Sequence, residues 1–282
     1  TRDALMRRIE AQYAITPDGT AIIEVAQACG LMHIEHEQRN PMRTTSYGVG
    51  LLVADALRHN CHKMIIGLGG SATSDAGIGM LRALIDTFAP EDHFNAIRPL
   101  FDNCEVILAS DVTNPLYGIN GAVHVFAKQK GATSSMIEAL DARAKQFALH
   151  TKRAMGFDKS MQPGAGAAGG LGYAFMQFLN AKMQSGAELL LHLLQFDKLL
   201  THADIVITGE GKSDCQTLMG KLPAVIMQHA RQHHLPTLLL SGQIEDHDSL
   251  ITAGFKAACA VTPSDMPLEE AMIPEKAKAN IR

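Results

Sequence analysis

The sequence predicts an α/β protein with mainly parallel sheets arranged in two lobes. Apolar runs of strand length alternate with segments of helical periodicity along most of the chain. Glycine-rich stretches stand at several of the junctions between these segments. The length of 282 residues is about twice that of a typical domain, which favours two lobes over one small core.

The first half of the chain opens with a hairpin signal. Strands are expected over 10–15 and 20–25, because the sequence Thr16-Pro17-Asp18-Gly19 between them is typical of a turn. The elements expected next are a loop over 33–48, a helix over 50–58, a buried strand over 64–68, a helix over 77–86 and a strand over 105–110.

The second half contains the clearest helix, expected over 134–153. Ser135 and Glu138 predict a capping box at its start. A boundary between lobes is expected between residues 185 and 205. The other elements expected here are an apolar helix over 173–183, strands over 204–208, 237–240 and 257–261, and a helix over 217–234.

Composition excludes several classes of function. The net charge of −4 provides no overall basic surface for nucleic acid. No apolar run approaches the length of a membrane-spanning helix. The five cysteines are scattered without a CxxC pair, which favours a reducing compartment, and we expect a cytoplasmic protein. The expected partner is a small-molecule substrate rather than nucleic acid or a membrane, and a homodimer is a further hypothesis.

Three glycine-rich stretches are candidates for binding phosphates. They are GLGGSATSDAG over 67–77, PGAGAAGGLG over 163–172 and TGEGKSDCQT over 208–217. Glycines at such junctions let the backbone approach a ligand, and free N–H groups at a helix start suit an anion, although the same glycines can serve turns and close packing. The candidate nucleotide-binding residues are Gly69, Gly70, Gly164, Gly166, Gly209, Gly211, Thr217 and Lys221.

Four acids follow the predicted strands and suggest phosphoryl transfer. This chemistry needs carboxylates for Mg²⁺ and for the attacking hydroxyl. Asp214 and Asp75 are the candidate catalytic bases, and a helix N-cap is the alternative role for each. Asp111 and Glu210 are the candidate Mg²⁺ ligands. The candidate substrate-binding residues are Arg39, Arg43, Ser71, Thr73 and Lys130.

A nicotinamide-dependent dehydrogenase is a weaker alternative. Gly67, Gly69 and Ala72 fit a GxGxxA dinucleotide fingerprint, with Asp86 as its acid. That acid should end a second strand, but residues 77–86 have helical periodicity. The GxxxxGK[ST] motif of P-loop kinases and the GxSxG motif of serine hydrolases are both absent from the sequence.

Taken together, the motifs resemble those of the bacterial-type (type 1) glycerate kinases. The resemblance rests on these stretches, in this order: IIEVAQACGL (22–31), QRNPMRTTSYGVG (38–50), IIGLGGSATSDAGIGM (65–80), SDVTNPLYGINGA (110–122), VFAKQKGAT (125–133), PGAGAAGGLG (163–172) and VITGEGKSDCQTLMGKLP (206–223). It implies phosphorylation of D-glycerate by Mg-ATP to 2- or 3-phosphoglycerate. It also implies two lobes around a cleft, with 1–190 as an inserted α/β lobe and 191–282 as part of a discontinuous Rossmann-like lobe.

The chain departs from this family at its amino-terminal end. The Asp-Ser-Phe-Lys-Gly and Ala-Asp-Gly-Gly-Glu-Gly stretches typical of the family are absent, so we expect the amino-terminal part of the family fold to be absent. Two hypotheses follow. The chain is a glycerate kinase, or it is a non-catalytic fragment or binding module that keeps the sugar-acid and phosphate site.

Overall fold

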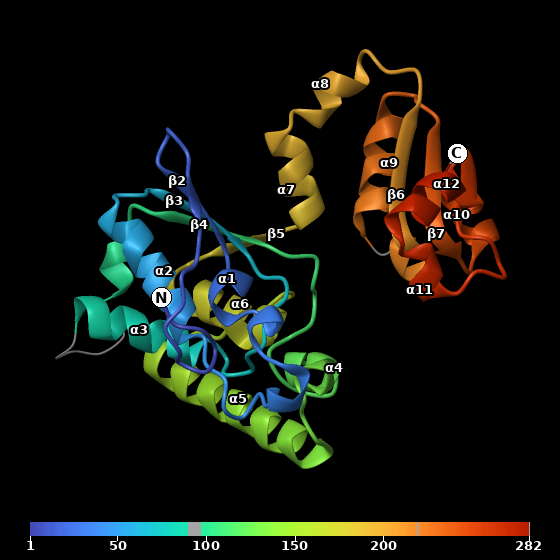
Figure 1. Cartoon of the computed structure of the whole chain (residues 1–282). Helices are drawn as coiled ribbons and strands as arrows, with labels where there is room; N and C mark the ends of the chain where they lie inside the picture. Colours follow the sequence, from blue (N-terminus) through green and yellow to red (C-terminus); the bar gives the residue numbers. More distant parts are fainter. Residues whose placement is uncertain (90–96, 219, 282) are drawn as a thin grey trace. The chain divides into compact units, whose positions relative to one another are not determined.

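The computed structural model describes residues 1–89, 97–218 and 220–281. The chain divides into two compact units, Thr1–Gly186 and Ala187–Arg282 (Figure 1). The division lies within the range expected from the sequence, and the expected boundary after residue 190 would cut the helix α7 (Gly186–Leu193). Both units contain parallel sheet with helices, which confirms the predicted fold class. The insertion of one lobe into another stays a prediction.

The sheet of unit 1 has five strands in the order β1-β2-β3-β4-β5. Its strands are β1 (Ala14–Ile15), β2 (Thr20–Glu24), β3 (Lys63–Gly67), β4 (Glu105–Ala109) and β5 (Lys182–Gln184). The predicted hairpin is confirmed as the antiparallel pair β1 and β2. The remaining pairs are parallel, with Ile22 opposite Ile65 and Ile65 opposite Ile107. The loops that follow β3 and β4 therefore leave the same edge of the sheet.

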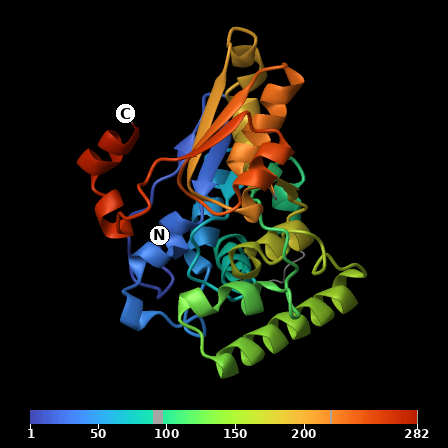
Figure 2. The same ribbon diagram turned by 90° about the vertical axis from the view of Figure 1, so that its right-hand side faces the viewer.

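Helices pack around this sheet over one large core. They are α1 (Ala26–Cys29), α2 (Tyr47–Arg58), α3 (Ile78–Phe88), α4 (Ala122–Phe126), α5 (Ser134–Met155) and α6 (Ala167–Phe178). Helix α6 is apolar on all sides, and its residues are almost all buried, among them Tyr173 and Phe175. Helix α5 has an exposed polar face and runs along the outside of the unit (Figure 2).

Two sequence expectations for unit 1 are wrong. The apolar helix expected over 173–183 is α6, which ends at Phe178; Asn180 adopts a left-handed conformation with φ 52° and the chain turns into β5. The cap of α5 is Thr133 rather than Ser135, because the Thr133 side chain accepts a hydrogen bond from the Met136 amide at 3.4 Å.

Unit 2 has a three-stranded parallel sheet in the order β6-β7-β8. Its elements are the strands β6 (Val206–Ser213), β7 (Thr237–Ile244) and β8 (Ala257–Ala260) and the helices α7, α8 (Phe196–Leu200), α9 (Leu222–Gln232), α10 (His247–Ala253), α11 (Leu268–Ala271) and α12 (Pro274–Ile281). Alternate β6 residues such as Val206 and Thr208 are buried, whereas Ile207 is 60% exposed. One face of this sheet therefore remains partly open.

The third glycine-rich stretch lies mainly in a strand, which corrects the loop expected from the sequence. Strand β6 continues to Ser213 because Glu210 pairs with Ser241 and Lys212 with Gln243. A single 3-10 turn over Cys215–Leu218 follows, so α9 begins five residues later than the helix expected from residue 217. Along the described residues, none of the helices is long and apolar enough for a membrane span.

Candidate functional site

A pocket in unit 1 lies at the carboxyl ends of β3 and β4. Ligands of open α/β sheets commonly bind at this edge. The pocket collects residues from the loops after β3 and β4, from the turn after α4 and from the start of α6. Its lining residues are Leu31, Leu68, Gly69, Gly70, Ser71, Val112, Phe126, Gln129, Lys130, Ala168 and Gly169.

Lys130 is the cation of this pocket. It is only 3% exposed, and its Nζ donates hydrogen bonds to Ser71 Oγ at 3.1 Å and to the Thr73 carbonyl oxygen at 2.6 Å. Burial lowers the pKa of Lys130 to about 8, against the opposing influence of Cys29 and Asp75. Across the part of the chain that the structure describes, Lys130 forms no ion pair. A buried ammonium with no carboxylate in direct contact is suited to an anionic ligand.

Backbone amides beside Lys130 add donors for such an anion. Within the described residues, the N–H groups of Gly69, Gly70 and Ser71 have no hydrogen-bond acceptor. Gly70 has a φ of +70°, and a side chain on Gly69 would meet open space. Successive free amides that include a left-handed residue form anion-binding concavities in proteins. The first glycine-rich stretch therefore has the features expected of an anion site.

The second glycine-rich stretch serves close packing. A Cβ on Gly164 would lie 2.5 Å from the Met183 side chain, and one on Gly166 would lie 2.4 Å from the Pro115 carbonyl. A Cβ on Gly169 would lie 1.9 Å from the Thr73 carbonyl. Neither Gly164 nor Gly166 lines the pocket. The structure thus supports the packing alternative for these two glycines over nucleotide binding.

The predicted acids of unit 1 occupy helix starts. The Asp75 carboxylate accepts hydrogen bonds from the amides of Gly77 and Gly79 at 3.1 Å each, at the beginning of α3. Asp111 accepts from the Ser185 hydroxyl at 2.8 Å and from the Gly186 amide at 3.0 Å, where α7 begins. Both acids thus bond amides at helix starts, although neither is an N-cap residue, since Gly77 is the N-cap of α3. The role of Asp75 as a base stays a prediction.

The predicted residues of unit 2 come together in a second cluster. Glu210 Oε1 accepts hydrogen bonds from Ser213 Oγ at 2.9 Å and from Thr217 Oγ1 at 2.5 Å. Lys221 Nζ lies 3.7 Å from Asp214 Oδ1. Lys221 is the N-cap residue of α9 rather than a residue one turn inside that helix. This cluster, defined as Glu210, Ser213, Asp214, Thr217 and Lys221, combines two carboxylates, two hydroxyls and one cation.

The glycines beside this cluster differ in their surroundings. Gly209 is paired with Leu240 in the sheet, and a Cβ there would lie 2.5 Å from the Leu240 carbonyl. A side chain on Gly211 would meet nothing within 4 Å. Gly209 is therefore required by strand packing, and only Gly211 has room for a ligand nearby.

The two predicted arginines lie outside the pocket. Arg43 is exposed and Arg39 is half-buried. The Arg39 carbonyl would lie 2.2 Å from a Cβ on Gly131, which places its backbone against the turn that carries Lys130. Their role in substrate binding stays a prediction. The sequence analysis missed Phe126 and Gln129, although both belong to the VFAKQKGAT stretch beside Lys130.

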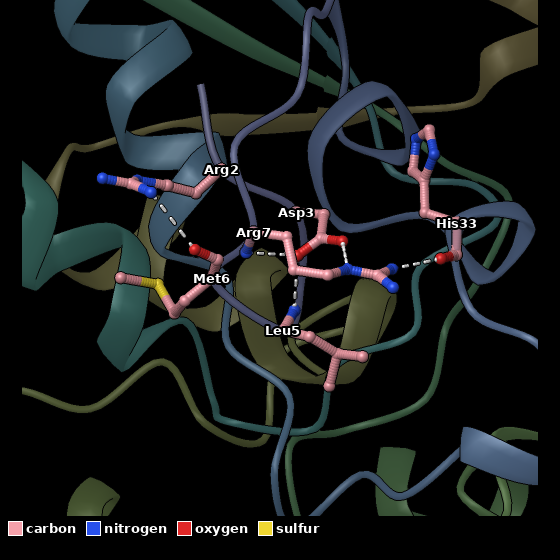
Figure 3. Close-up of polar contacts among 6 residues, drawn as sticks. All are labelled: Arg2, Asp3, Leu5, Met6, Arg7 and His33. Carbon is pink, nitrogen blue, oxygen red and sulfur yellow. Dashed lines mark hydrogen bonds and ion pairs between the residues drawn. The ribbon is translucent and has the colours of Figure 1, made fainter.

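The sequence analysis also missed an ionic anchor near the amino-terminal end, in which only the carboxylate is buried. Asp3 is 1% exposed and bonds Arg7 Nε at 2.5 Å and the amides of Leu5 and Arg7 at 2.9 Å (Figure 3). Arg7 in turn donates to the His33 carbonyl at 2.6 Å. This anchor fixes residues 3–7 against the polar stretch predicted as a loop. Short Asp-x-x-x-Arg spacing outside a helix carries no distinctive sequence signal.

Comparison with known proteins decides the family. The family model described as "Glycerate kinase family" matches residues 1–282. The chain belongs to the glycerate kinase family. The kinase predicted from the sequence is thereby confirmed, and membership of this family implies the use of ATP. The dehydrogenase alternative has no structural support, because Asp86 lies inside α3 instead of ending a strand.

Similar proteins extend beyond the length of this chain. The glycerate kinase of Halalkalibacterium halodurans is 38% identical over 94% of this chain and 74% of its own length. The glycerate 2-kinase of Escherichia coli is 38% identical over 95% of this chain and 75% of its own length. A crystal structure assigned as glycerate kinase 2 from Salmonella typhimurium LT2 aligns with a TM-score of 0.77 at 34% identity, covering 99% of this chain and 76% of that protein. This glycerate kinase family chain thus spans about three quarters of these relatives.

Proposed function

We propose that the protein transfers the γ-phosphoryl group of ATP to D-glycerate in the manner of the bacterial-type (type 1) enzymes. The observation that carries this proposal is the buried, unpaired Lys130 beside the free amides of Gly69, Gly70 and Ser71. A short hydroxy acid presents one carboxylate, which matches one buried ammonium with a few amide donors. The pocket of unit 1 is therefore the proposed glycerate site.

The pocket walls suit a small acid. Leu68, Val112 and Phe126 give it apolar sides, while Lys130 and Gln129 supply polar groups. A mostly apolar pocket with few polar groups fixes the orientation of its ligand and strengthens the attraction between charges. Ser71 bonds Lys130 and thereby holds the ammonium against the glycine-rich loop. The Thr73 carbonyl oxygen accepts a second hydrogen bond from the same ammonium.

The unit 2 cluster is the proposed nucleotide site. Lys221 supplies a cation at the N-terminus of α9, where the positive end of the helix dipole favours an anion. Glu210 and the hydroxyl of Thr217 are oxygen donors of the kind that Mg²⁺ prefers. Within the described residues, no group of three or more His, Cys, Asp or Glu side chains can hold a metal. Mg²⁺ bound through one or two carboxylates together with nucleotide phosphates would neutralise phosphate charge.

Asp214 is the proposed base. In phosphoryl transfer the acceptor hydroxyl oxygen forms a bond to the γ-phosphorus, the bond from that phosphorus to the bridging oxygen of ADP breaks, and the hydroxyl proton passes to a carboxylate base. Asp214 lies beside Lys221 at 3.7 Å, so its charge is held near the proposed phosphate site. Asp111 bonds the Gly186 amide at the start of α7 and remains the second predicted Mg²⁺ ligand.

The cysteines indicate the compartment in which the protein works. All five cysteines are free thiols, which supports a reducing compartment, and we propose the cytoplasm. A homodimer stays a prediction that sedimentation would check.

A coupled assay of ADP release tests the proposed activity. We expect turnover that requires glycerate and is abolished by chelation of divalent metal. Asp214→Asn should lower kcat at least about tenfold, or about 1.4 kcal/mol of barrier, with the folded state retained. Asp248→Asn, a change at an exposed helix residue, is the matched control. Glycerate binding without turnover would favour the binding module instead.

A further inference from the structure

The carboxylate of Asp75 is the most heavily bonded acid near the pocket. In addition to the two amides of α3, its Oδ2 accepts hydrogen bonds from the Ser46 amide at 2.8 Å and from Ser46 Oγ at 2.9 Å. Thr45 Oγ1 adds a longer contact at 3.4 Å. Four of these five contacts fall on Oδ2, and only the Gly77 amide reaches Oδ1. Asp75 therefore ties the starts of α2 and α3 together, mainly through Oδ2.

The same loop holds Lys130 a few residues earlier. Ser71 and Thr73 accept the hydrogen bonds of the Lys130 ammonium. Between them, the Ala72 amide donates to the Cys29 carbonyl at 2.7 Å, and Gly169 packs directly on the Thr73 carbonyl. The segment over 71–75 is thus fixed at one end by Asp75 and carries the acceptors of Lys130 at the other. Displacement of the Asp75 end would move both acceptors.

Asp75 also supplies the negative charge that Lys130 needs. Burial is the main influence on Lys130 and lowers its pKa to about 8; Cys29 and Asp75 both oppose this fall. Burial raises the pKa of Cys29 itself to about 12, so this thiol is neutral at pH 8. Asp75 is the remaining source of negative charge among the groups that influence Lys130. Its effect on Lys130 is electrostatic as well as mechanical.

We propose that Asp75 is a positioning residue for the acceptor site: it anchors the 71–75 segment and holds Lys130 in the pocket as the cation that receives the carboxylate of glycerate. This inference rests on the proposed function, because it takes Lys130 to be the group that meets the substrate. In this proposal Asp75 is not the catalytic base named as a candidate from the sequence; it acts on the substrate through Lys130.

The test is the pH dependence of glycerate binding, measured by calorimetry on the full chain. In the unchanged protein, affinity should fall as pH rises through about 8, where Lys130 loses its proton. Asp75→Asn keeps the shape of the side chain and removes its charge. We expect the inflection to move down by about one pH unit, so that Kd at pH 8 rises about fivefold. The difference in Kd between the two proteins should shrink at pH 6, where Lys130 is protonated in both.

Asp246→Asn is the matched control. Asp246 caps α10 in unit 2 by accepting from the Ser249 amide at 3.3 Å, so this variant loses the charge of a helix cap away from the pocket loop. It should keep the inflection of the unchanged protein. A folded Asp75→Asn variant with the same inflection and the same Kd would overturn the inference. Loss of a helix cap alone would lower stability without moving the inflection.

A second variant covers the case in which Asp75→Asn does not fold. Ser46→Ala keeps the Asp75 charge and removes one of its anchors, at 2.9 Å, so Kd should rise about two- to fivefold at every pH with the inflection unchanged. An unchanged Kd in folded Ser46→Ala protein would contradict the anchoring role. Failure of the proposed function is recognised separately: Lys130→Met would then bind glycerate as well as the unchanged protein does.

Discussion

Individual glycines in this protein have two distinct physical roles, although their sequence contexts look alike. Gly69 lines the pocket and has open space where a Cβ would stand. Gly169 also lines the pocket, but its φ of +66° and its contact with the Thr73 carbonyl leave no room for a side chain. The sequence identified both stretches as anion-binding candidates. It did not separate ligand-facing glycines from packing glycines, because that distinction depends on contacts between segments far apart in the chain.

Alanine substitutions should separate these roles. Gly169→Ala should destabilise the protein by about 3 kcal/mol or more, because the new methyl group must displace backbone and adopt a left-handed conformation. Gly69→Ala should change the free energy of unfolding by less than about 1 kcal/mol. Urea denaturation of both variants provides the measurement. Equal losses of stability would show that the two glycines do not differ in packing.

At the scale of secondary structure, prediction succeeded where the signal is local. The hairpin turn, β3, β4 and the long helix α5 follow from turn residues and from apolar periodicity within each segment. Prediction failed at β6, where Gly209 and Gly211 suggested a loop but pairing with β7 extends the strand. Strand pairing is a long-range interaction, so it can override the local preference of glycine for turns and loops.

The attachment of α7 and α8 to α9 should depend on pH. His229 Nδ1 lies 2.9 Å from Asp197 Oδ1 and Nε2 lies 3.0 Å from Glu188 Oε2, so both ring nitrogens meet carboxylates. Only the protonated imidazole can donate both bonds. The hydrogen bond to Asp197 is the main cause that raises the pKa of His229, and Glu188 adds to it. His233 also approaches Asp197, at 3.4 Å.

The sign of the effect follows from this raised pKa. The bonds of His229 contribute their full stability below about pH 6.5, the ordinary value for histidine, and this contribution is lost as pH rises through the raised pKa. His229→Gln should therefore lower the urea midpoint more at pH 6 than at pH 9. His202→Gln, at an exposed histidine, should have the same small effect at both pH values. A pH-independent loss for His229→Gln would contradict the charged clamp.

For the whole molecule, the sequence predicted the family, whereas the inserted and discontinuous lobes and the site residues stay predictions. Motifs that carry the resemblance lie in the pocket loop and in the unit 2 cluster. The sequence therefore named these residues as candidates before their geometry was known: Gly69, Gly70, Ser71, Lys130, Glu210, Asp214, Thr217 and Lys221. The burial of Lys130 was not predictable from its local sequence, since AKQKGA has the composition of a surface turn. Its position depends on contacts with residues 71–73, which are distant in sequence.

The most direct test of the central claim is glycerate binding to Lys130→Met, measured by calorimetry at pH 7. Lys128→Met is the matched control, because Lys128 is exposed and belongs to the same turn. Loss of a buried, charge-assisted contact of about 1.5–3 kcal/mol corresponds to a Kd raised about tenfold or more. We predict that rise for Lys130→Met and an unchanged Kd for Lys128→Met. Equal affinity in the two variants would contradict the assignment of the unit 1 pocket as the glycerate site.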